Sequence, residues 1–378
     1  MSTGEVINHL AQFRAKRGLG AAQLADLIGV SRQTIYAIEA GTYVPNTSVS
    51  LKLGRILETT VEELFQLQVD EHAPAQMADA VVLGNLETMA PGLPLRLCDV
   101  DGHLVAVAPE PGGWGLPSSD AVLLSPLQGA RRYANAKVEI LNEGWKKSPR
   151  ILIAGCDPSA AILAHSLQTQ GCELVISYEN STHSLQLLHN NCAHIAGTHL
   201  QENVNGKTDL TPITKMFSRQ SVVVLNYAIW QEGFVVAAGN PKKILSLADL
   251  LRKDIQITNR EPGAGSRRLL DDLLRKNDIS SKDVRGYERT IAGHMPAARL
   301  VRDGEVDCCI STQAVARTLG LEFVPLVEKP YLLVIRRKYL GLPPVQAMLE
   351  TLGRASFRRE VEACTGYNMR HSGDFLFG

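Results

Sequence analysis

The 378-residue chain lacks a long hydrophobic run, an excess of either charge and a Cys-x-x-Cys pair. No run is long enough to span a membrane, and no apolar signal region precedes the first amphipathic segment, so we expect a cytoplasmic protein without a membrane partner. Because 39 Lys and Arg balance 39 Asp and Glu, a general polyanion binder is excluded. The odd number of cysteines, seven, fits a reducing compartment.

Residues 23–39 predict two short amphipathic helices joined by a tight turn, which is a helix-turn-helix. Gly29 supplies the conformational freedom for the turn, and Ser31 is expected to cap the second helix. The apolar stripes of the two helices are expected to be formed by Leu24, Leu27 and Ile28 and by Ile35 and Ile38.

The pattern around this motif resembles the Xre/Cro-type DNA-binding domain over residues 1–68. Five helices are implied. The first is expected to hold Val6, Ile7, Leu10 and Phe13, the fourth to hold Leu51, Leu53 and Leu57, and the fifth to close the domain over residues 61–65.

The resemblance implies that the first turn of the third helix reads base edges in the major groove of double-stranded DNA. Arg32 suits guanine and Gln33 suits adenine, and Tyr36 is a further candidate for a base contact. The expected interface also includes Ser31, together with Gln23 and Thr34, which are expected to contact phosphates. One small module with six basic and six acidic residues binds weakly, so we expect a dimer on a palindromic operator. A helical bundle for protein contact is the alternative.

Residues 69–149 change to Gly- and Pro-rich turns between short alternating apolar runs. Residues 95–100 and 103–107 flank Asp101-Gly102 and predict a hairpin. We expect a small β-rich connector.

From residue 150 the chain alternates buried strands with amphipathic helices, starting with a strand at 151–155, a helix at 160–170 and a strand at 174–177. Such parallel sheets bind ligands at the carboxyl ends of their strands. The loop 259–271 follows a strand and opens a helix. There Gly263 and Gly265 would turn amides inward beside Ser266 and Arg267, which favours an anion. An ordinary turn with Arg267 paired to Asp271 fits the residues equally well.

Residues 150–378 resemble the regulator-attached branch of the type II periplasmic-binding-protein superfamily, related to molybdate-binding proteins. The resemblance rests on residues 154–158, 194–200, 239–242, 247–250, 259–271, 286–287, 294 and 304–307. It implies two α/β lobes joined by two crossing strands, with residues 150–230 and 330–378 in the first lobe and 232–328 in the second. The chain is thus expected to be multi-domain: an all-α five-helix domain, the β-rich connector and a two-lobed α/β ligand-sensing domain.

The resemblance places a ligand in the cleft between the lobes. Ser159, Ser181 and Ser266 would hold a tetrahedral oxyanion such as molybdate or tungstate. The acid of Asp157 and the base of Arg267 would also suit an organic anion or a zwitterion, although Asp157 could instead cap the following helix. Thr182, Gly265 and His294 complete the expected lining.

These predictions together indicate a one-component regulator that senses a small anionic ligand. No nucleophile, base and orienting group come together in the sequence, so we expect no enzyme, no cofactor and no metal. A redox-responsive regulator using Cys156 is one alternative, since a helix start lowers a thiol pKa, whereas Cys308 and Cys309 fall in an apolar run. The others are a metal-responsive regulator using His189, His194 and His199, and a cytoplasmic solute- or cofactor-binding protein that uses its helix-turn-helix for association.

Overall fold

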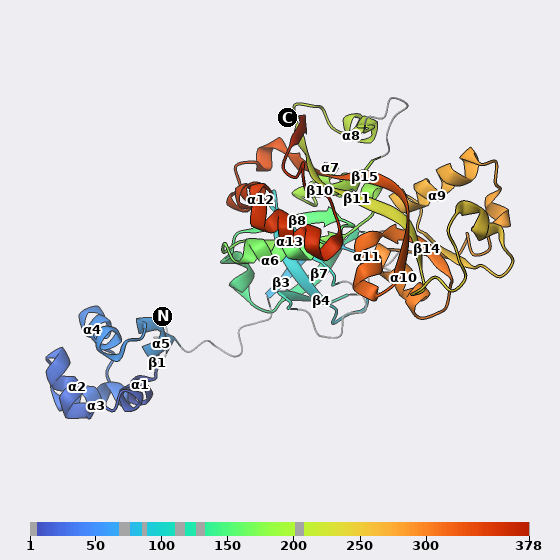
Figure 1. Ribbon diagram of the computed structural model, residues 1–378. Helices are drawn as coiled ribbons and strands as arrows, with labels where there is room; N and C mark the ends of the chain where they lie inside the picture. The colour runs from blue at the N-terminus through green and yellow to red at the C-terminus, as the bar shows by residue number, and fades with distance from the viewer. Residues whose placement is uncertain are drawn as a thin grey trace. The chain divides into compact units, whose positions relative to one another are not determined.

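The computed structural model describes residues 6–67, 76–84, 89–109, 118–125, 133–200 and 208–377 (Figure 1). The chain divides into two compact units, Met1–Pro74 and Ala75–Gly378. Within the described residues, no helix is both long and apolar enough to cross a membrane.

The first unit contains the five predicted helices, which confirms the helix-turn-helix architecture. They are α1 (Leu10–Lys16), α2 (Ala21–Ile28), α3 (Arg32–Glu39), α4 (Thr47–Leu57) and α5 (Val61–Leu64). Gly29 takes a left-handed conformation with φ of 80° at the end of α2, as the turn requires. Ser31 caps α3, because its Oγ accepts a hydrogen bond of 3.0 Å from the amide of Thr34.

Two details of the predicted first unit are wrong. Val6 and Ile7 lie outside α1, in a short strand β1 (Val6–Asn8) that pairs antiparallel with β2 (Phe65–Leu67) and ties the two ends of the domain together. β-branched side chains favour such a strand. Leu27 is 59% exposed, since the buried stripe of α2 is centred on Leu24, Ala25 and Ile28 and Leu27 falls beyond its edge.

The β-rich segment is a closed barrel with the strand order β3-β5-β4-β6-β7. Its strands are β3 (Gln76–Leu83), β4 (Pro94–Val100), β5 (His103–Val107), β6 (Ala121–Leu123) and β7 (Tyr133–Ile140). The predicted hairpin is confirmed, since β4 and β5 pair antiparallel around Asp101 and Gly102, both at positive φ.

The barrel shares its buried residues with the first lobe. Leu83, Cys98 and Val105 belong to the same apolar cluster as Ile151 and Ile195 of the lobe. Figure 1 shows the barrel strands beneath the lobe, where β4 contacts β8. Burial of this common surface fixes the barrel to the lobe.

A polar network joins the same two parts. The guanidinium of Arg150 donates to Asp120 at 2.6 and 3.2 Å, and its Nη2 lies 2.9 Å from a carboxylate oxygen of Glu173. Arg96 contacts both acids, at 3.1 Å from Asp120 and 2.6 Å from Glu173. Asp120 therefore joins barrel residues to Arg150, the first residue of the lobe sheet.

The two lobes share one sheet of nine strands, with the path β13-β12-β14-β11-β15-β10-β8-β9 and β16 paired to β11. The strands are β8 (Arg150–Gly155), β9 (Glu173–Tyr178), β10 (Ile195–His199), β11 (Val222–Val236), β12 (Ile257–Arg260), β13 (Thr290–Ile291), β14 (Cys308–Thr312), β15 (Glu322–Arg336) and β16 (Phe375–Phe377). β11 and β15 pair antiparallel over 15 residues each and run through both lobes, which confirms the two predicted crossing strands.

Helices cover the sheet in both lobes. The first lobe has α6 (Ala160–Gln168), α7 (Ser181–His189), α8 (Thr211–Met216), α12 (Pro343–Gly353) and α13 (Ala355–Thr365), and the second has α9 (Gly265–Lys276), α10 (His294–Arg302) and α11 (Gln313–Leu319). Short 3-10 turns lie at Glu143–Lys146, Leu247–Leu251, Ser281–Asp283 and Arg337–Tyr339. The strands β9, β8 and β10 are parallel to one another, and so are β13, β12 and β14. The carboxyl ends of both sets lie near the middle of the crossing pair, since β10 ends opposite Tyr331 and β14 ends opposite Glu232.

We expect Asp120→Ala to destabilise the larger unit by about 2–4 kcal/mol, because it removes the main partner of the nearly buried guanidinium of Arg150. Urea unfolding followed by tryptophan fluorescence measures the loss. Glu143→Ala is the control, since its exposed pair with Lys146 should leave the midpoint unchanged. Equal midpoints for wild type and Asp120→Ala would show that the network contributes nothing.

Candidate functional site

The candidate site lies where loops after the strands of one lobe meet those of the other. Thr182 Oγ1 donates to the carbonyl of Gly263 at 3.2 Å and accepts from Arg268 Nη2 at 3.0 Å. Asn180 Nδ2 lies 3.4 Å from Glu261 Oε1. These contacts link the first lobe directly to the second, so the lobes are closed on each other.

Asp157 and Ser159 follow β8 and are buried on the first-lobe side. Asp157 Oδ1 accepts from the amide of Ser159 at 2.6 Å, which is the local bond expected of a capping residue, while Oδ2 makes no hydrogen bond with a described residue. Ser159 Oγ lies 2.8 Å from the hydroxyl of Tyr227. Burial raises the pKa of Asp157 to about 6.

Ser181 and Ser266 are buried and already hydrogen-bonded within the protein. Ser181 Oγ accepts from the amide of His199 at 3.2 Å, and Ser266 Oγ donates to Glu232 Oε1 at 2.6 Å. Gly265, the first residue of α9, packs so closely that a Cβ there would lie 1.9 Å from His199 Nε2. These contacts bring Ser181, Gly265 and Ser266 to one place around His199 and Glu232.

Arg267 and His294 occupy different surroundings. The guanidinium of Arg267 lies over the ring of Tyr287, 4.9 Å from its centroid, and donates to the carbonyl of Arg260 at 3.2 Å. Asp271 accepts from the hydroxyl of Tyr287 at 2.6 Å, so Arg267 and Asp271 both contact Tyr287 rather than forming an ion pair with each other. His294 is buried with its Nδ1 3.1 Å from Ser311 Oγ.

The structure adds buried charges that the sequence analysis did not select. Arg260, at the end of β12, is 3% exposed; its Nε and Nη2 donate to Glu261 at 2.9 and 3.1 Å, and its Nη1 makes no hydrogen bond with a described residue. Glu232 of β11 is completely buried, with Lys329 Nζ 3.4 Å and His199 Nδ1 3.7 Å away. The sequence signal that could have identified Glu232 is that it is the only charged residue in the largely apolar run 222–236.

Aromatic and imidazole rings surround these charges. The buried ring of Trp230 lies 4.6 Å from Tyr331, 5.1 Å from His199, 5.8 Å from His294 and 5.9 Å from Tyr367, measured between centroids. Its indole nitrogen has no hydrogen-bond partner among the described residues. Burial lowers the pKa of His199 to about 4 and the pKa of His294 well below its ordinary value, which favours the neutral ring in both.

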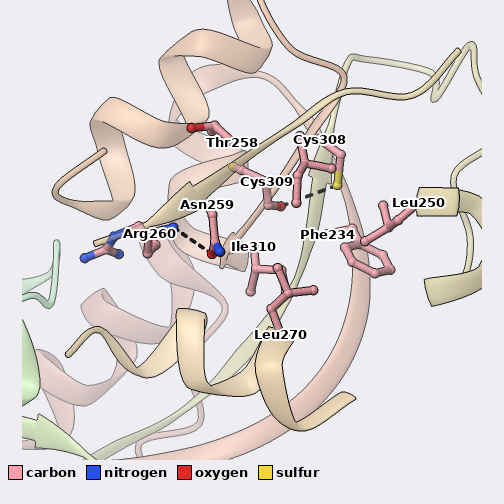
Figure 2. Close-up of a pocket in the computed structure, with 10 residues that line it drawn as sticks. Phe234, Leu250, Thr258, Asn259, Arg260, Leu270, Cys308, Cys309 and Ile310 are labelled. Carbon is pink, nitrogen blue, oxygen red and sulfur yellow. Dashed lines mark hydrogen bonds between the residues drawn. The ribbon is translucent and has the colours of Figure 1, made fainter. Parts of the chain in front are cut away.

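Figure 2 shows how Arg260 differs from its neighbours in the second lobe. Phe234, Leu250, Leu270 and Ile310 line a cavity of about 10 Å³, roughly the space of one water molecule. The guanidinium of Arg260 extends away from these apolar side chains, toward the first-lobe side of the view. Consistent with this direction, its charge acts on the thiol of Cys156, which follows β8.

The alternative of a redox-responsive regulator requires a low pKa of the Cys156 thiol, and the structure contradicts it. Burial raises that pKa to about 12, because loss of solvation outweighs the charge of Arg260. A thiol in this state is a poor redox sensor. Cys308 and Cys309 are packed at 1% and 2% exposure, as predicted.

The three histidines proposed as metal ligands have separate surroundings. His194 Nδ1 accepts from the amide of Leu152, His199 lies beside Glu232, and His189 contacts Phe217. Within the described ranges, no three His, Cys, Asp or Glu side chains gather as metal ligands would.

The candidate DNA interface is the exposed first turn of α3. Arg32 Nη2 donates to the hydroxyl of Tyr36 at 2.8 Å, and its guanidinium lies 5.2 Å from the centroid of that ring. Gln33 is exposed beside it, and Thr34 Oγ1 lies 2.8 Å from Ser31 Oγ. Gln23 Oε1 accepts from the amide of Gly20 at the start of α2.

Both units of the chain are similar to known proteins. Residues 164–353 match the model of the PBP superfamily domain, and residues 8–67 match a helix-turn-helix domain model. The protein YvgK of Bacillus subtilis is 30% identical over 229 residues, which cover 60% of this chain and 74% of that protein. A helix-turn-helix-type transcriptional regulator of Methanocaldococcus jannaschii is 39% identical over 64 residues, or 17% of this chain and 97% of the regulator.

Among solved structures, the sulfate-binding protein SubI of Mycobacterium tuberculosis aligns with a TM-score of 0.43 and 17% identity. The alignment covers 57% of this chain and 85% of SubI.

We expect Asp157→Asn to stabilise the larger unit relative to wild type as pH rises. The folded-state pKa of about 6 lies above the ordinary 3.8, so the contribution of Asp157 is complete below about pH 4 and lost as pH rises through 6. The difference in unfolding free energy between variant and wild type should grow by about 2 kcal/mol between pH 4 and 7, measured by urea unfolding.

Asp254→Asn is the control with the opposite sign. Arg252 lowers the pKa of the exposed Asp254 carboxyl, so this variant should lose stability relative to wild type as pH rises from below the ordinary pKa. A difference for Asp157→Asn that does not change with pH would mean that the Asp157 carboxylate is ionised in the folded protein.

Proposed function

The chain belongs to the PBP superfamily and carries a helix-turn-helix domain, and on that premise we propose that it is a one-component transcriptional regulator controlled by a small anionic ligand. In this proposal residues 1–68 bind DNA and residues 150–378 bind the ligand between the two lobes. Residues 69–149 connect these two domains. The protein acts in the cytoplasm without a cofactor or a catalytic step.

The DNA-binding arm of the proposal rests on α3. The cap formed by Ser31 fixes the first turn, and the bond from Arg32 to Tyr36 holds the guanidinium over the exposed face. Arg32 and Gln33 would contact base edges, while Gln23 and Thr34 would contact phosphates. A module of this size gains affinity by binding as a dimer to a palindromic operator.

The proposal that residues 150–378 bind a ligand rests on one observation: Nη1 of Arg260 makes no hydrogen bond with a described residue. A buried guanidinium nitrogen without an acceptor is costly, and an anionic group in the cleft would supply the acceptor. Arg260 thus takes the charge-binding part first expected of Arg267. The proposed lining also holds Asp157, Ser159, Ser181, Thr182, Gly265, Ser266 and His294, all of them on the loops and helix starts described above.

For ligand binding to affect DNA binding, the ligand must change the arrangement of the two lobes. Contacts such as Thr182 to Gly263 must break for a ligand to enter and can reform around it, which is hinge closure. In a dimer on two half-sites, such a change would alter the spacing of the two recognition helices.

We expect Arg32→Ala and Gln33→Ala each to weaken operator binding by about 1–3 kcal/mol while leaving binding to scrambled DNA almost unchanged. Fluorescence anisotropy at fixed salt, on an operator selected from random DNA, measures both affinities. Arg55→Ala, an exposed cation on α4, serves as the control and should keep wild-type specificity. Equal losses on both DNAs would assign Arg32 and Gln33 to phosphates.

The coupling itself is measured on the full-length chain. A compound from a panel of oxyanions and organic acids that raises the melting temperature should change operator affinity by about 5- to 150-fold, and operator DNA should change its affinity by the same factor. Binding of such a compound with no change in operator affinity would contradict the proposed regulation.

A further inference from the structure

We propose that the ligand is a zwitterion, a small organic acid that also carries an amine, held by Arg260 of the second lobe and Asp157 of the first. The inference rests on the proposed function and refines its ligand: the anionic group that the cleft would sense belongs to a molecule that also carries a cationic amine. It assigns the two contacts to two lobes, so that one small molecule joins both.

The anionic end of the ligand is fixed by Arg260. Two of its three guanidinium nitrogens are engaged by Glu261, which already neutralises its charge, and Nη1 remains to donate. One carboxylate oxygen satisfies one such nitrogen. Figure 2 shows this guanidinium leaving the apolar side of the second lobe.

The cationic end is fixed by Asp157. Its carboxylate is 3% exposed, Oδ1 is held by the amide of Ser159, and Oδ2 accepts no hydrogen bond from a described residue. Tyr367 lies against this carboxyl, but its hydroxyl makes no hydrogen bond of good geometry. Loss of solvation is the largest effect on Asp157, so an ammonium group in the cleft would favour its ionised form.

The charges between these two ends disfavour a bare dianion. Arg260 is paired with Glu261 and Lys329 with Glu232, while Arg268, the third cation at the site, donates to Thr182 and to the carbonyl of Gly263. Cys156 precedes Asp157 in the chain, and the charges of Arg260, Glu232 and Glu261 all act on the pKa of its thiol. A molybdate or sulfate ion buried there would meet the carboxylates of Asp157, Glu232 and Glu261, and only Arg268 among the three cations is not paired with one of them. A molecule of zero net charge avoids this repulsion.

The experiment is a thermal-shift and calorimetry series on the full-length protein with matched compounds. The zwitterions are glycine, β-alanine, 4-aminobutyrate, 5-aminovalerate and the standard α-amino acids. Acetate, propionate, butyrate and valerate are the same chains without the amine, and molybdate, tungstate, sulfate and phosphate are the bare oxyanions. We expect at least one zwitterion to raise the melting temperature when its matched acid and the oxyanions do not.

Variants then assign the two ends. Asp157→Asn, which keeps the shape of the side chain, should lower affinity for the active zwitterion by about 10- to 100-fold and abolish its advantage over the matched acid. Arg260→Ala should remove binding of both. Arg275→Ala, which removes an exposed arginine of α9 that pairs with Asp272 away from the proposed contacts, is the control and should bind as wild type. Circular dichroism establishes that each variant is folded.

Failures of the two proposals differ. Binding of an oxyanion in preference to every zwitterion, no shift with any compound, or full affinity in Asp157→Asn overturns the zwitterion inference. If an oxyanion also changes operator affinity, the proposed regulator stands. A zwitterion that binds through Arg260 and Asp157 but leaves operator affinity unchanged would overturn the regulator and leave the ligand class supported.

Discussion

The antiparallel pairing of β11 with β15 is the constraint on which the rest of the larger unit depends. Each strand contributes 15 residues, and their register runs from Val222 opposite Arg336 to Val236 opposite Glu322. β10 of the first lobe joins β15, β14 of the second lobe joins β11, and β16 of the first lobe pairs with the other end of β11. The pair is therefore part of both lobes, and residues near its middle lie where the lobes meet.

The middle of this pair carries polar residues that an ordinary core strand would not. Glu232 faces Lys329 and Ser266, and the strand register shifts between Glu232 and Gly233. A β-bulge bends a strand and turns its side chains. The irregularity in the strand pairing thus lies beside a buried carboxylate that contacts Lys329, His199 and Ser266, and burying this charge costs free energy.

Local sequence signals predicted most of the fold, because periodicity, caps and turns act over a few residues. Gly29, Ser31 and the Asp101-Gly102 turn occupy the predicted positions. Leu27 and Val6 were misplaced because tertiary packing decides which residues at the edge of an apolar stripe are buried. The periodicity of apolar residues does not reveal which surface the helix or strand packs against.

The candidate site was harder to predict, since it depends on contacts between residues far apart in the chain. The loop 259–271 was selected correctly as a strand-end loop, but three arginines stand in it and the sequence does not say which one meets the first lobe. The structure gives Arg267 a partner in Tyr287, gives Arg268 one in Thr182, and leaves a nitrogen of Arg260 without one. The redox alternative for Cys156 failed for the same reason, because the loss of solvation that raises its thiol pKa depends on the folded surroundings and not on the local turn.

The common core of the barrel and the first lobe has a consequence for protein engineering. Leu83, Cys98 and Val105 pack with Ile151, so a cut at residue 149 would expose apolar surface on both pieces. The boundary between the two compact units falls at Pro74 and Ala75 instead. A chimera that transfers the two-lobed domain to another protein must therefore carry the barrel with it, as one module beginning at residue 75.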